Sequence, residues 1–445
     1  MNALPWRFLV LADVGVESAR PVPVTDADAW LASLEAAVDL PATDGTPARR
    51  LEIPDATAFA PQAIAARLGG APPAAVEAAL HHPALQRLES AWRGLKLLLE
   101  HAGPAVEVEV LSAPRAALAA RFREAVFTPE LESRTPLTLV LADFDFSHKP
   151  ADLALLGELA GMVKVLQAPL VAGASAGFFD LRFLIQAVAL PDLLARLGDP
   201  AHASFRSFQA SEPARWVALT INRWLQRSPY TAEAGGHAEA VSESNPESFL
   251  WGRGVWLAGA AVVRSVKQNG HAFAIAGPQG GRFENLPTRA FPAKANVTAT
   301  EVALSETQML ELHRAAFTPL VGPLRTDVAV IPMAVTCFRL TPGKLTVEGT
   351  LAYQIAAARL AQFCGRLLDE MPAAGANEVA AFFRGELAEF LGPLAGEKPE
   401  EAVSVEVREE TVDGAAVPIA EVRIRPAIRL ENKAVEFGFT LPLRG

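Results

Sequence analysis

The segment DFDFSH places two carboxylates and an imidazole within six residues. Asp143, Asp145 and His148 are side chains of the kinds that hold a divalent cation when they converge. On a strand, Asp143 and Asp145 share one face, but no later Glu completes a known cation-binding loop. We therefore expect a structural role for this segment and no metal ligand in it.

Two glycine-rich segments could cradle a phosphate. GASAG (173–177) and GPQGG (277–281) each follow an apolar run, and glycine lets backbone N–H groups converge on an anion at a helix start. Neither segment matches GxGxxG or GxxxxGK[ST]. We expect both to be turns, and a nucleotide-binding α/β enzyme built around residues 168–177 stays open as an alternative.

Histidine and serine patterns give no support to catalysis. His81 and His82 are adjacent, whereas a zinc pair on a helix needs a spacing of about three or four. The GxSxG motif is absent, and the eight histidines are scattered along the chain. The sequence predicts no enzyme, no cofactor and no metal site.

The strongest helical pattern lies in residues 81–99, HHPALQRLESAWRGLKLLL. Apolar side chains recur there at intervals of three and four, which places them on one face of a helix. Pro83 suits the first turn, where a backbone N–H has no helical partner. The apolar positions are Leu85, Leu88, Trp92, Leu95 and Leu99.

Glu89 and Arg93 lie four residues apart on this helix and can pair across one turn. We expect this salt bridge to orient Trp92 and to do no acid–base chemistry. Trp92 shares the apolar face with Leu88, so we expect its ring to lie in the core.

Helix and strand patterns alternate along the chain. Apolar runs such as 137–142 have no polar face, as expected when helices cover both sides of a sheet. The predicted fold is α/β, with mixed sheets covered by helices, and the polar segment 231–248 is expected to be an exposed loop. The predicted helices are 26–40, 59–68, 83–100, 114–126, 151–166, 181–197, 249–269, 345–370 and 376–391, and the predicted strands are 5–12, 48–53, 105–111, 137–143, 168–174 and 272–277.

The C-terminal part has a different pattern. Residues 403–412, 420–430 and 434–441 alternate apolar and polar side chains with period two, which predicts half-exposed antiparallel strands. The last strand can be an arm whose unpaired edge a neighbour completes, or it can close an ordinary hairpin within the chain. The side chains that share its apolar face are Val435, Phe437, Phe439 and Leu441.

Composition limits the possible partners and compartments. The chain has 445 residues, 51% of them hydrophobic, so a sizeable core and more than one domain are expected. A net charge of −10 gives no electrostatic reason to bind nucleic acid. Cys337 and Cys364 do not form a disulfide framework, and no apolar run reaches the length of a membrane span. A reducing cytoplasm and no membrane insertion are expected.

Several segments resemble one protein family. HHPALQRLESAWRGL resembles the hHP-x-aLE-x-x-WRGL helix of the large sheath subunit (TssC or VipB) of the type VI secretion system. LTLVLADFDFSH (137–148) and the helix and strand after it are similar to that family's LVGDYEFSH and HAPFIAAAS segments. FRSFQASEPARWVALTINRWLQRSPY, FLWGRGVWLAGAAVVRSVKQNGHAFAIAG and FTPLVG continue the resemblance in the same order, over about residues 78–330. It makes the following residues parts of a structural motif: Pro83, Leu88, Glu89, Trp92, Arg93 and Asp143.

The N-terminal segment is similar to a different chain, the small sheath subunit (TssB or VipA). PWRFLVLA (5–12) followed by a helix, a strand and FAPQAI resembles the start of that subunit. Gly69, Gly70, Pro72 and Pro73 interrupt the helical pattern and mark a junction. The expected organisation is a small-subunit-like segment over 1–70, a large-subunit-like α/β core over 71–400 and a C-terminal β-strand region over 401–445.

The resemblance implies a structural subunit of a contractile sheath. Such subunits bind one another and other TssB/TssC-like subunits, and assemble helically around an inner tube of Hcp next to a baseplate. A sheath-derived cap, baseplate adaptor or regulator that does not polymerise is the alternative. Phe8 and Val10 on the first strand join the C-terminal apolar face as candidate assembly residues.

Two departures from the family pattern concern these partners. Residues 1–70 occupy the place of the large subunit's N-terminal extension, which puts recognition by the recycling ATPase ClpV in doubt. Helix 376–391 lies at about the place of the family's tube-facing helix, yet it carries Glu378, Glu386 and Glu389 against Arg384. A basic tube-facing surface is therefore not expected.

Overall fold

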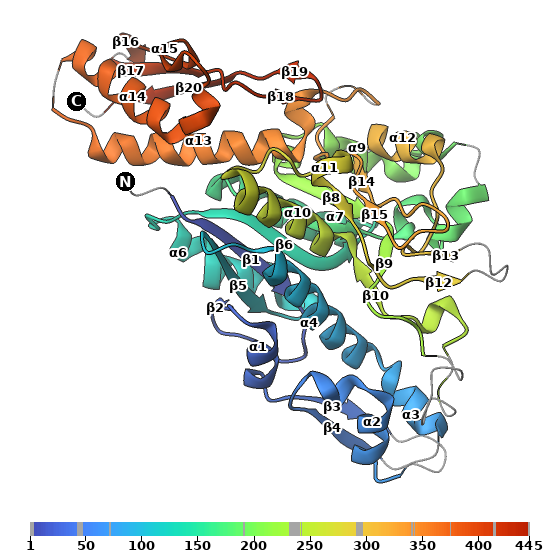
Figure 1. Cartoon of the computed structure of the whole chain (residues 1–445). Coiled ribbons are helices and arrows are strands. Elements are labelled where there is room, and N and C mark those ends of the chain that lie inside the picture. The colour runs from blue at the N-terminus through green and yellow to red at the C-terminus, as the bar shows by residue number, and fades with distance from the viewer. Residues whose placement is uncertain are drawn as a thin grey trace.

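A seven-stranded sheet forms the centre of the molecule (Figure 1). The computed structural model describes residues 4–41, 48–70, 73–189, 192–230, 241, 243–290, 297–339, 341, 343–373, 375–412 and 415–443. All neighbouring strands of the sheet are parallel except β2, which is antiparallel to β5. The order is β14 (Phe317–Pro319), β8 (Val217–Ile221), β7 (Leu170–Ala174), β6 (Leu137–Phe146), β1 (Trp6–Ala12), β5 (Val106–Ser112) and β2 (Val22–Pro23).

Helices cover both faces of this sheet. Helices α4 (Pro83–His101) and α10 (Gly254–Asn269) lie on one face, and α5 (Leu118–Phe122) and α7 (Pro150–Leu166) lie on the other. Successive residues of a strand point to opposite faces, so β1 contributes to both cores. Phe8 and Val10 pack with the α4 cluster, whereas Leu9 and Leu11 pack with the α7 cluster.

Helices α4 and α10 approach each other at Gly94. A Cβ atom at Gly94 would lie 2.2 Å from the ring of Trp256 on α10, so only glycine fits there without a shift of the helices. The Trp256 side chain is 1% exposed and cannot swing into solvent. The glycine of the WRGL segment is therefore a packing requirement of the α4–α10 contact.

We predict that Gly94→Ala lowers the free energy of unfolding by about 1–3 kcal/mol through overpacking. Gly161→Ala on α7 is the matched control, because a Cβ atom there has no other atom within 4 Å. The control should be neutral or up to about 1 kcal/mol more stable, since alanine favours a helix. Urea unfolding of both variants checks this, and a Gly94 variant as stable as the control would contradict the close contact.

The N-terminal 80 residues contribute β1 and β2 to the central sheet and form a small lobe at the opposite end from the C-terminal strands (Figure 1). The helix predicted over 26–40 is wrong in its second half, because the chain turns at Glu35 with φ 46 and continues as a strand. That strand pairs with β4 and buries Val38 against the core. The lobe consists of α1 (Ala27–Ser33), β3 (Ala36–Leu40), β4 (Arg49–Ile53), α2 (Pro61–Arg67) and α3 (Pro73–Leu80).

Other predicted elements also differ from the structure. The helix expected over 181–197 is a 3₁₀ segment (Leu184–Ala189) and a separate α8 (Leu193–Arg196), which Asp192 caps by accepting from the N–H of Ala195. Residues 272–277 form no strand. The hydroxyl of Ser265 donates to the carbonyl of His271 and accepts from the N–H of Ala274, so this segment bonds to a side chain and not to a neighbouring strand. Most of the predicted loop 231–248 lies outside the described residues.

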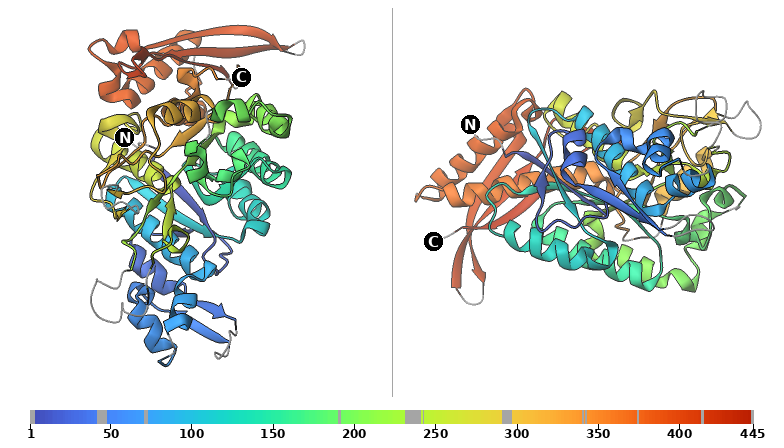
Figure 2. Two further views of the ribbon diagram at one scale, coloured as in Figure 1. Left: turned by 90° about the vertical axis from the view of Figure 1, so that its right-hand side faces the viewer. Right: turned by 90° about the horizontal axis from the view of Figure 1, so that it is seen from below.

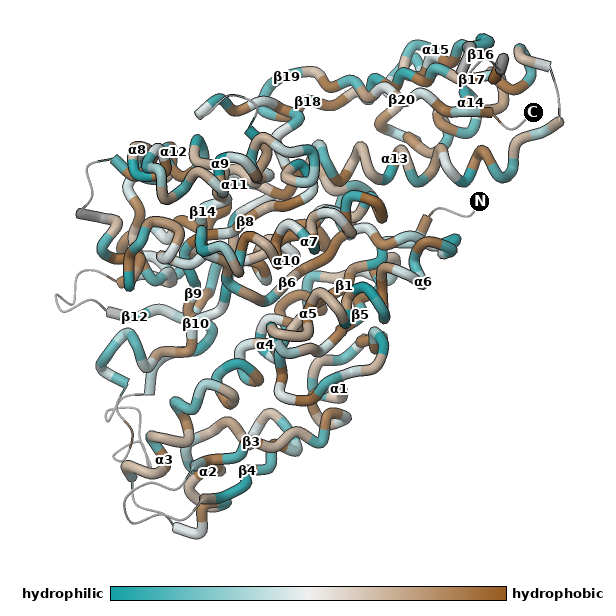
Figure 3. Tube along the Cα trace, turned by 180° about the vertical axis from the view of Figure 1, so that it is seen from behind, coloured by the Kyte–Doolittle hydropathy of each residue, from teal (hydrophilic) through white to brown (hydrophobic). Residues whose placement is uncertain are grey.

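The C-terminal residues form a separate layer on α13 (Leu351–Glu370). Strands β16 (Val403–Val412), β17 (Ala415–Ile424) and β20 (Phe437–Pro442) make an antiparallel sheet in that order, packed on α14 (Ala376–Leu391). Strands β16 and β17 project from the body as a long ribbon (Figure 2). Figure 3 shows the change from mostly apolar central strands to alternating polar and apolar residues in this sheet. The strand predicted over 420–430 is split between the end of β17 and the short β18 (Arg429–Leu430).

Short elements connect these layers. In the described part of the chain these elements are strands of two or three residues and short helices. They are α6 (Thr128–Glu130), α8 (Leu193–Arg196), α9 (Ala203–Gln209), α11 (Gly277–Gly280), α12 (Glu306–Arg314), α15 (Pro399–Ala402), β9 (Arg223–Leu225), β10 (Trp251–Arg253), β11 (Arg282–Phe283), β12 (Arg289–Ala290), β13 (Val297–Thr298), β15 (Ala329–Val330), β18 (Arg429–Leu430) and β19 (Lys433–Ala434).

Candidate functional site

Trp92 lies in the interior, at the contact between α4 and the N-terminal lobe. Its side chain is 6% exposed, and its ring stacks on Phe59 at a centroid distance of 5.6 Å. The indole N–H donates to Asp28 Oδ1 at 2.8 Å. Leu88 is buried on the same face, and Pro83 is the first residue of α4. The predicted apolar face of α4 thus joins two parts of the fold.

Glu89 belongs to a buried network of charges. Its Oε1 accepts from Arg93 Nε at 2.8 Å, as the spacing of four predicted, and lies 3.3 Å from Arg227 Nε. Arg227 also donates two hydrogen bonds to Glu243, at 2.6 and 2.8 Å. His81 Nε2 lies 3.2 Å from Glu243 Oε1. The network joins α4 to the segment after β9.

The charges of this network stabilise one another. Burial by itself would lower the pKa of Arg227, but the hydrogen bond to Glu243 and the charge of Glu89 raise it above its usual value. Burial opposes the charge of Glu243, and the hydrogen bonds from Arg227 and His81 nevertheless lower its pKa. Both residues are therefore charged at neutral pH, and the network is structural.

Asp143 and Asp145 share a single partner, Arg253 at the end of β10. Arg253 Nη1 lies 3.1 Å from Asp143 Oδ1, and Arg253 Nε lies 2.9 Å from Asp145 Oδ2. Burial raises the pKa of Asp143, and the Arg253 charge opposes that rise. The two carboxylates face a guanidinium in place of a cation site, and His148 lies apart from them beside Asp180.

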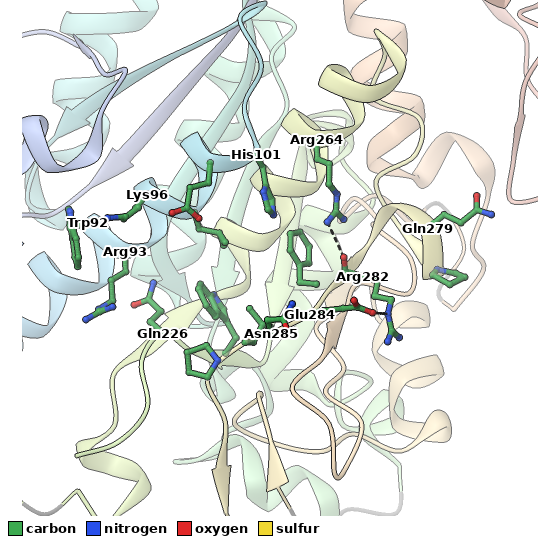
Figure 4. A pocket seen from close by; sticks show the side chains of 17 residues that line it. Trp92, Arg93, Lys96, His101, Gln226, Arg264, Gln279, Arg282, Glu284 and Asn285 are labelled. Atoms are coloured by element: carbon green, nitrogen blue, oxygen red, sulfur yellow. Dashed lines mark hydrogen bonds and ion pairs between the residues drawn. The ribbon is translucent and has the colours of Figure 1, made fainter. Parts of the chain in front are cut away.

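A cleft of about 800 Å³ opens beside α4 (Figure 4). Trp92, Arg93 and Lys96 line one side of it, and Arg264 and Arg282 line the other. Each cation is already engaged by the chain itself, as Arg93 is by Glu89. Lys96 pairs with Asp28 at 3.2 Å, Arg264 donates to the backbone carbonyls of Gly280 and Arg282, and Arg282 pairs with Glu284 at 2.6 Å. Arg93, Lys96 and Arg282 are therefore paired with carboxylates, whereas the guanidinium of Arg264 contacts backbone carbonyls.

The glycine-rich segments serve close packing. A Cβ atom at Gly173 would lie 2.3 Å from Asp145 Oδ1, so a carboxylate occupies the space that a phosphate would need. Ser175 accepts from the N–H of Gly177, and the helix that follows has only four residues. In GPQGG, a Cβ atom at Gly280 would lie 2.2 Å from the carbonyl oxygen of Ala274. The N–H groups of Gly177, Gly277 and Gly281 are each engaged within the chain.

Phe8 and Val10 are core residues, and the expectation that they form an assembly surface is wrong for this fold. Strand β1 lies between β6 and β5 in the middle of the central sheet, with Phe8 0% and Val10 1% exposed. Their side chains pack under α4 and reach no surface.

The C-terminal candidates also pack within the chain. Strand β20 pairs with β17, so the hairpin alternative describes this structure and the free arm does not. Phe437 is 1% exposed and stacks on Tyr353 of α13 at 4.7 Å, and Val435 is 5% exposed. Phe439 and Leu441 are half-buried against the same core. These four side chains hold the C-terminal sheet on the body.

The outer edge of β20 remains open among the described residues. Leu443 N–H donates to the carbonyl of Pro418 at 2.8 Å, and in an antiparallel ladder every second residue faces the partner strand. Leu441 and Phe439 thus face β17, whereas Gly438 and Thr440 direct their N–H and C=O groups away from it. Both residues are exposed. An exposed edge of this kind can pair with another strand.

Residues 66–337, more than half of the 445-residue chain, match the family described as VipB: EvpB/VC_A0108, tail sheath N-terminal domain. This chain belongs to the VipB tail sheath family. A curated relative, the type VI secretion system sheath protein TssC1 of Pseudomonas aeruginosa, is 27% identical over 295 residues. The match covers 60% of this chain and 59% of that relative. The residues before 66, which were expected to resemble the small sheath subunit, lie outside the VipB match.

Two solved structures with a partly similar backbone are a sheath protein and a baseplate protein. The sheath tail protein of Listeria innocua is similar with a TM-score of 0.43 at 9% identity. The match covers 100% of this chain and 96% of the Listeria protein. A chain of the anti-feeding prophage baseplate has a TM-score of 0.41 at 12% identity, with 100% and 91% covered. These scores are too low to add to the assignment by sequence.

Sequence reasoning missed several residues of the buried networks. Arg227, Glu243 and Arg253 were not singled out, although Arg227 and Arg253 lie in two of the segments that resemble the family. A charged residue inside an otherwise apolar run, as in FLWGRGVW, is the signal that could have found Arg253.

None of the helices in the described part of the chain combines the length and apolar character that crossing a membrane requires.

Proposed function

We propose that this chain is a structural subunit of a type VI secretion-like contractile sheath and assembles helically around an inner tube. Membership of the VipB family over residues 66–337 carries the proposal. The buried ion pairs support a structural role, because they engage the carboxylates of Glu89, Glu243 and Asp143 with arginine side chains. We further propose the division into 1–70, 71–400 and 401–445 as small-subunit-like, large-subunit-like and C-terminal strand regions.

Such a subunit works through its interfaces. A tube requires a heterologous, non-closing contact between two different surfaces of the same chain. Contraction requires that these contacts have two arrangements of different free energy, so that subunits rotate and repack. We propose self-association and other TssB/TssC-like subunits as the main partners, with an Hcp-like inner tube and a baseplate as further partners.

The outer edge of β20 is the surface we propose for one of these contacts. A strand from a neighbouring subunit would add beside β20 and gain backbone hydrogen bonds with Gly438 and Thr440. The edge lies on the C-terminal sheet, whose apolar side chains already pack on α13. The contact would therefore depend on the backbone of the edge and leave the core of the subunit unchanged.

We predict that Thr440→Pro prevents assembly and leaves the fold intact. Proline removes an N–H that points away from β17, and it is tolerated on the outer side of an edge strand, as Pro442 in the same strand illustrates. Thr440→Ala is the matched control and should assemble as the wild-type chain does. Circular dichroism checks the fold, and sedimentation and negative-stain electron microscopy check assembly.

The same microscopy tests the proposed function. Purified chain, alone and with a small sheath subunit and tube protein, should form tubes or extend a sheath. Binding only at sheath ends, without incorporation along the length, would instead support the non-polymerising cap or adaptor. If Thr440→Pro polymerised normally, the β20 edge would have to be abandoned while the sheath assignment could stand.

A further inference from the structure

We propose that His148, Asp180 and His202 form a binding site for one zinc ion. The proposal does not depend on sheath assembly. The potential ligand atoms of the three residues all lie within 4.8 Å of one another. Two imidazoles and one carboxylate are a donor set that suits Zn²⁺, with water at the fourth position, better than Ca²⁺ or Mg²⁺, which prefer oxygen ligands.

Three segments that are distant in sequence bring these residues together. His148 follows β6, Asp180 ends the 3₁₀ helix Ala176–Phe179, and His202 ends the 3₁₀ helix Pro200–His202. His148 Nε2 lies 2.8 Å from Asp180 Oδ1, and His202 Nε2 lies 4.0 Å from Asp180 Oδ2. The two imidazole rings lie 4.3 Å apart. The carboxylate of Asp180 thus lies beside both imidazoles.

The imidazole of His202 has the environment of a metal ligand. Its side chain is 2% exposed, and Nε2 lies 2.7 Å from the carbonyl oxygen of Phe178. This carbonyl therefore holds the same nitrogen that lies beside Asp180, and zinc would displace that hydrogen bond. Nδ1 of His202 is buried and has no hydrogen-bond partner among the described residues.

Of the other two ligands, His148 is buried and Asp180 is accessible to solvent. Ser147, next to His148, donates to Asp152 from both its N–H and its hydroxyl, at 2.8 and 2.7 Å. Asp180 has φ 53, a left-handed conformation that few residues adopt, and its side chain is 44% exposed. A hydrated ion can therefore reach the carboxylate from solvent, while the two imidazoles lie beneath it.

Lys149 is the competitor for this site. Its Nζ lies 3.0 Å from Asp180 Oδ1, and its side chain is 60% exposed. Exposed ion pairs of this kind stabilise proteins little, so the ammonium can move into water when zinc binds. Exchange of the ammonium for zinc replaces a single positive charge beside Asp180 by the double charge of Zn²⁺, which the two imidazoles also bind. The ion would join the end of β6 to the two 3₁₀ helices.

The test uses the full-length chain, free of any histidine tag and stripped with a chelator. Calorimetric titration with zinc chloride should give one bound ion per chain, and cobalt chloride should give the visible absorption of a tetrahedral site. Asp180→Asn should weaken zinc binding by more than about a hundredfold, because loss of a direct ligand exceeds the roughly tenfold to hundredfold loss caused by removing an outer-shell partner. Asparagine adopts the left-handed conformation readily, so this variant keeps the local backbone.

Glu400→Gln is the control, because Glu400 is an exposed carboxylate on α15, in the C-terminal layer. It should bind zinc as the wild-type chain does. Absence of zinc binding by the wild-type chain would overturn the proposal. Equal affinity of the Asp180→Asn variant, or binding without the tetrahedral cobalt spectrum, would also overturn it, because the ion would then be bound by other groups.

Discussion

Replacement of Arg227 by Met should lower the free energy of unfolding by about 3–5 kcal/mol. The guanidinium binds both oxygens of Glu243 and lies 3.3 Å from Glu89. The side chains of these two glutamates are 0% and 1% exposed, so neither carboxylate can be hydrated if the guanidinium is lost. Methionine fills a similar volume, so the loss measures buried charge that Arg93 and His81 compensate only in part, and not a cavity.

The control is a surface ion pair of the same chemistry. Arg408→Met removes the contact to Glu421 at 2.5 Å, where the side chains are 57% and 27% exposed. Its effect should be about 0–1 kcal/mol, because water and salt screen exposed charges. Chemical denaturation at low and high salt distinguishes the two. Similar losses in both variants would show that the Arg227 network is not buried in solution.

Replacement of Trp92 by Ala should also cost about 3–5 kcal/mol and reduce the yield of folded protein. The substitution leaves a cavity beside Phe59, removes the ring stacking and leaves Asp28 without its indole donor. Thermal and denaturant unfolding measure the loss.

Trp92→Phe is the matched variant, since it keeps an aromatic ring and loses only the hydrogen bond and part of the volume. Its loss should be clearly smaller than that of Trp92→Ala. A Trp92→Ala chain that keeps wild-type stability but fails to bind one partner would show that Trp92 faces a ligand and is not part of the core.

The DFDFSH segment shows why its partners could not be predicted. Alternation on a strand correctly placed Asp143 and Asp145 on one side, but the shared partner Arg253 lies 110 residues after Asp143 along the chain. His148 contacts Asp180, 32 residues further on. Local spacing contains no information about which of several later segments a strand end will meet.

The position of the first strand in the central sheet could not be predicted for the same reason. The apolar run 5–12 was predicted as a buried strand, and β1 occupies Trp6–Ala12. Its place between β5 and β6 was not predicted, and this place turns Phe8 and Val10 from candidate interface residues into core residues. Strand order depends on which apolar faces cover one another, and an apolar run can pair with any other apolar run.

The sequence by itself determined the periodic elements and the family. The spacing of Leu88 and Trp92 defined the face of α4, and the period-two pattern defined the C-terminal strands, because side-chain direction follows from local backbone geometry. Only the tertiary structure decided that β20 closes onto β17 and that Arg227 links Glu89 to Glu243. Those contacts form between distant segments, and their stability comes from burial and pairing that exist only once the whole chain is packed.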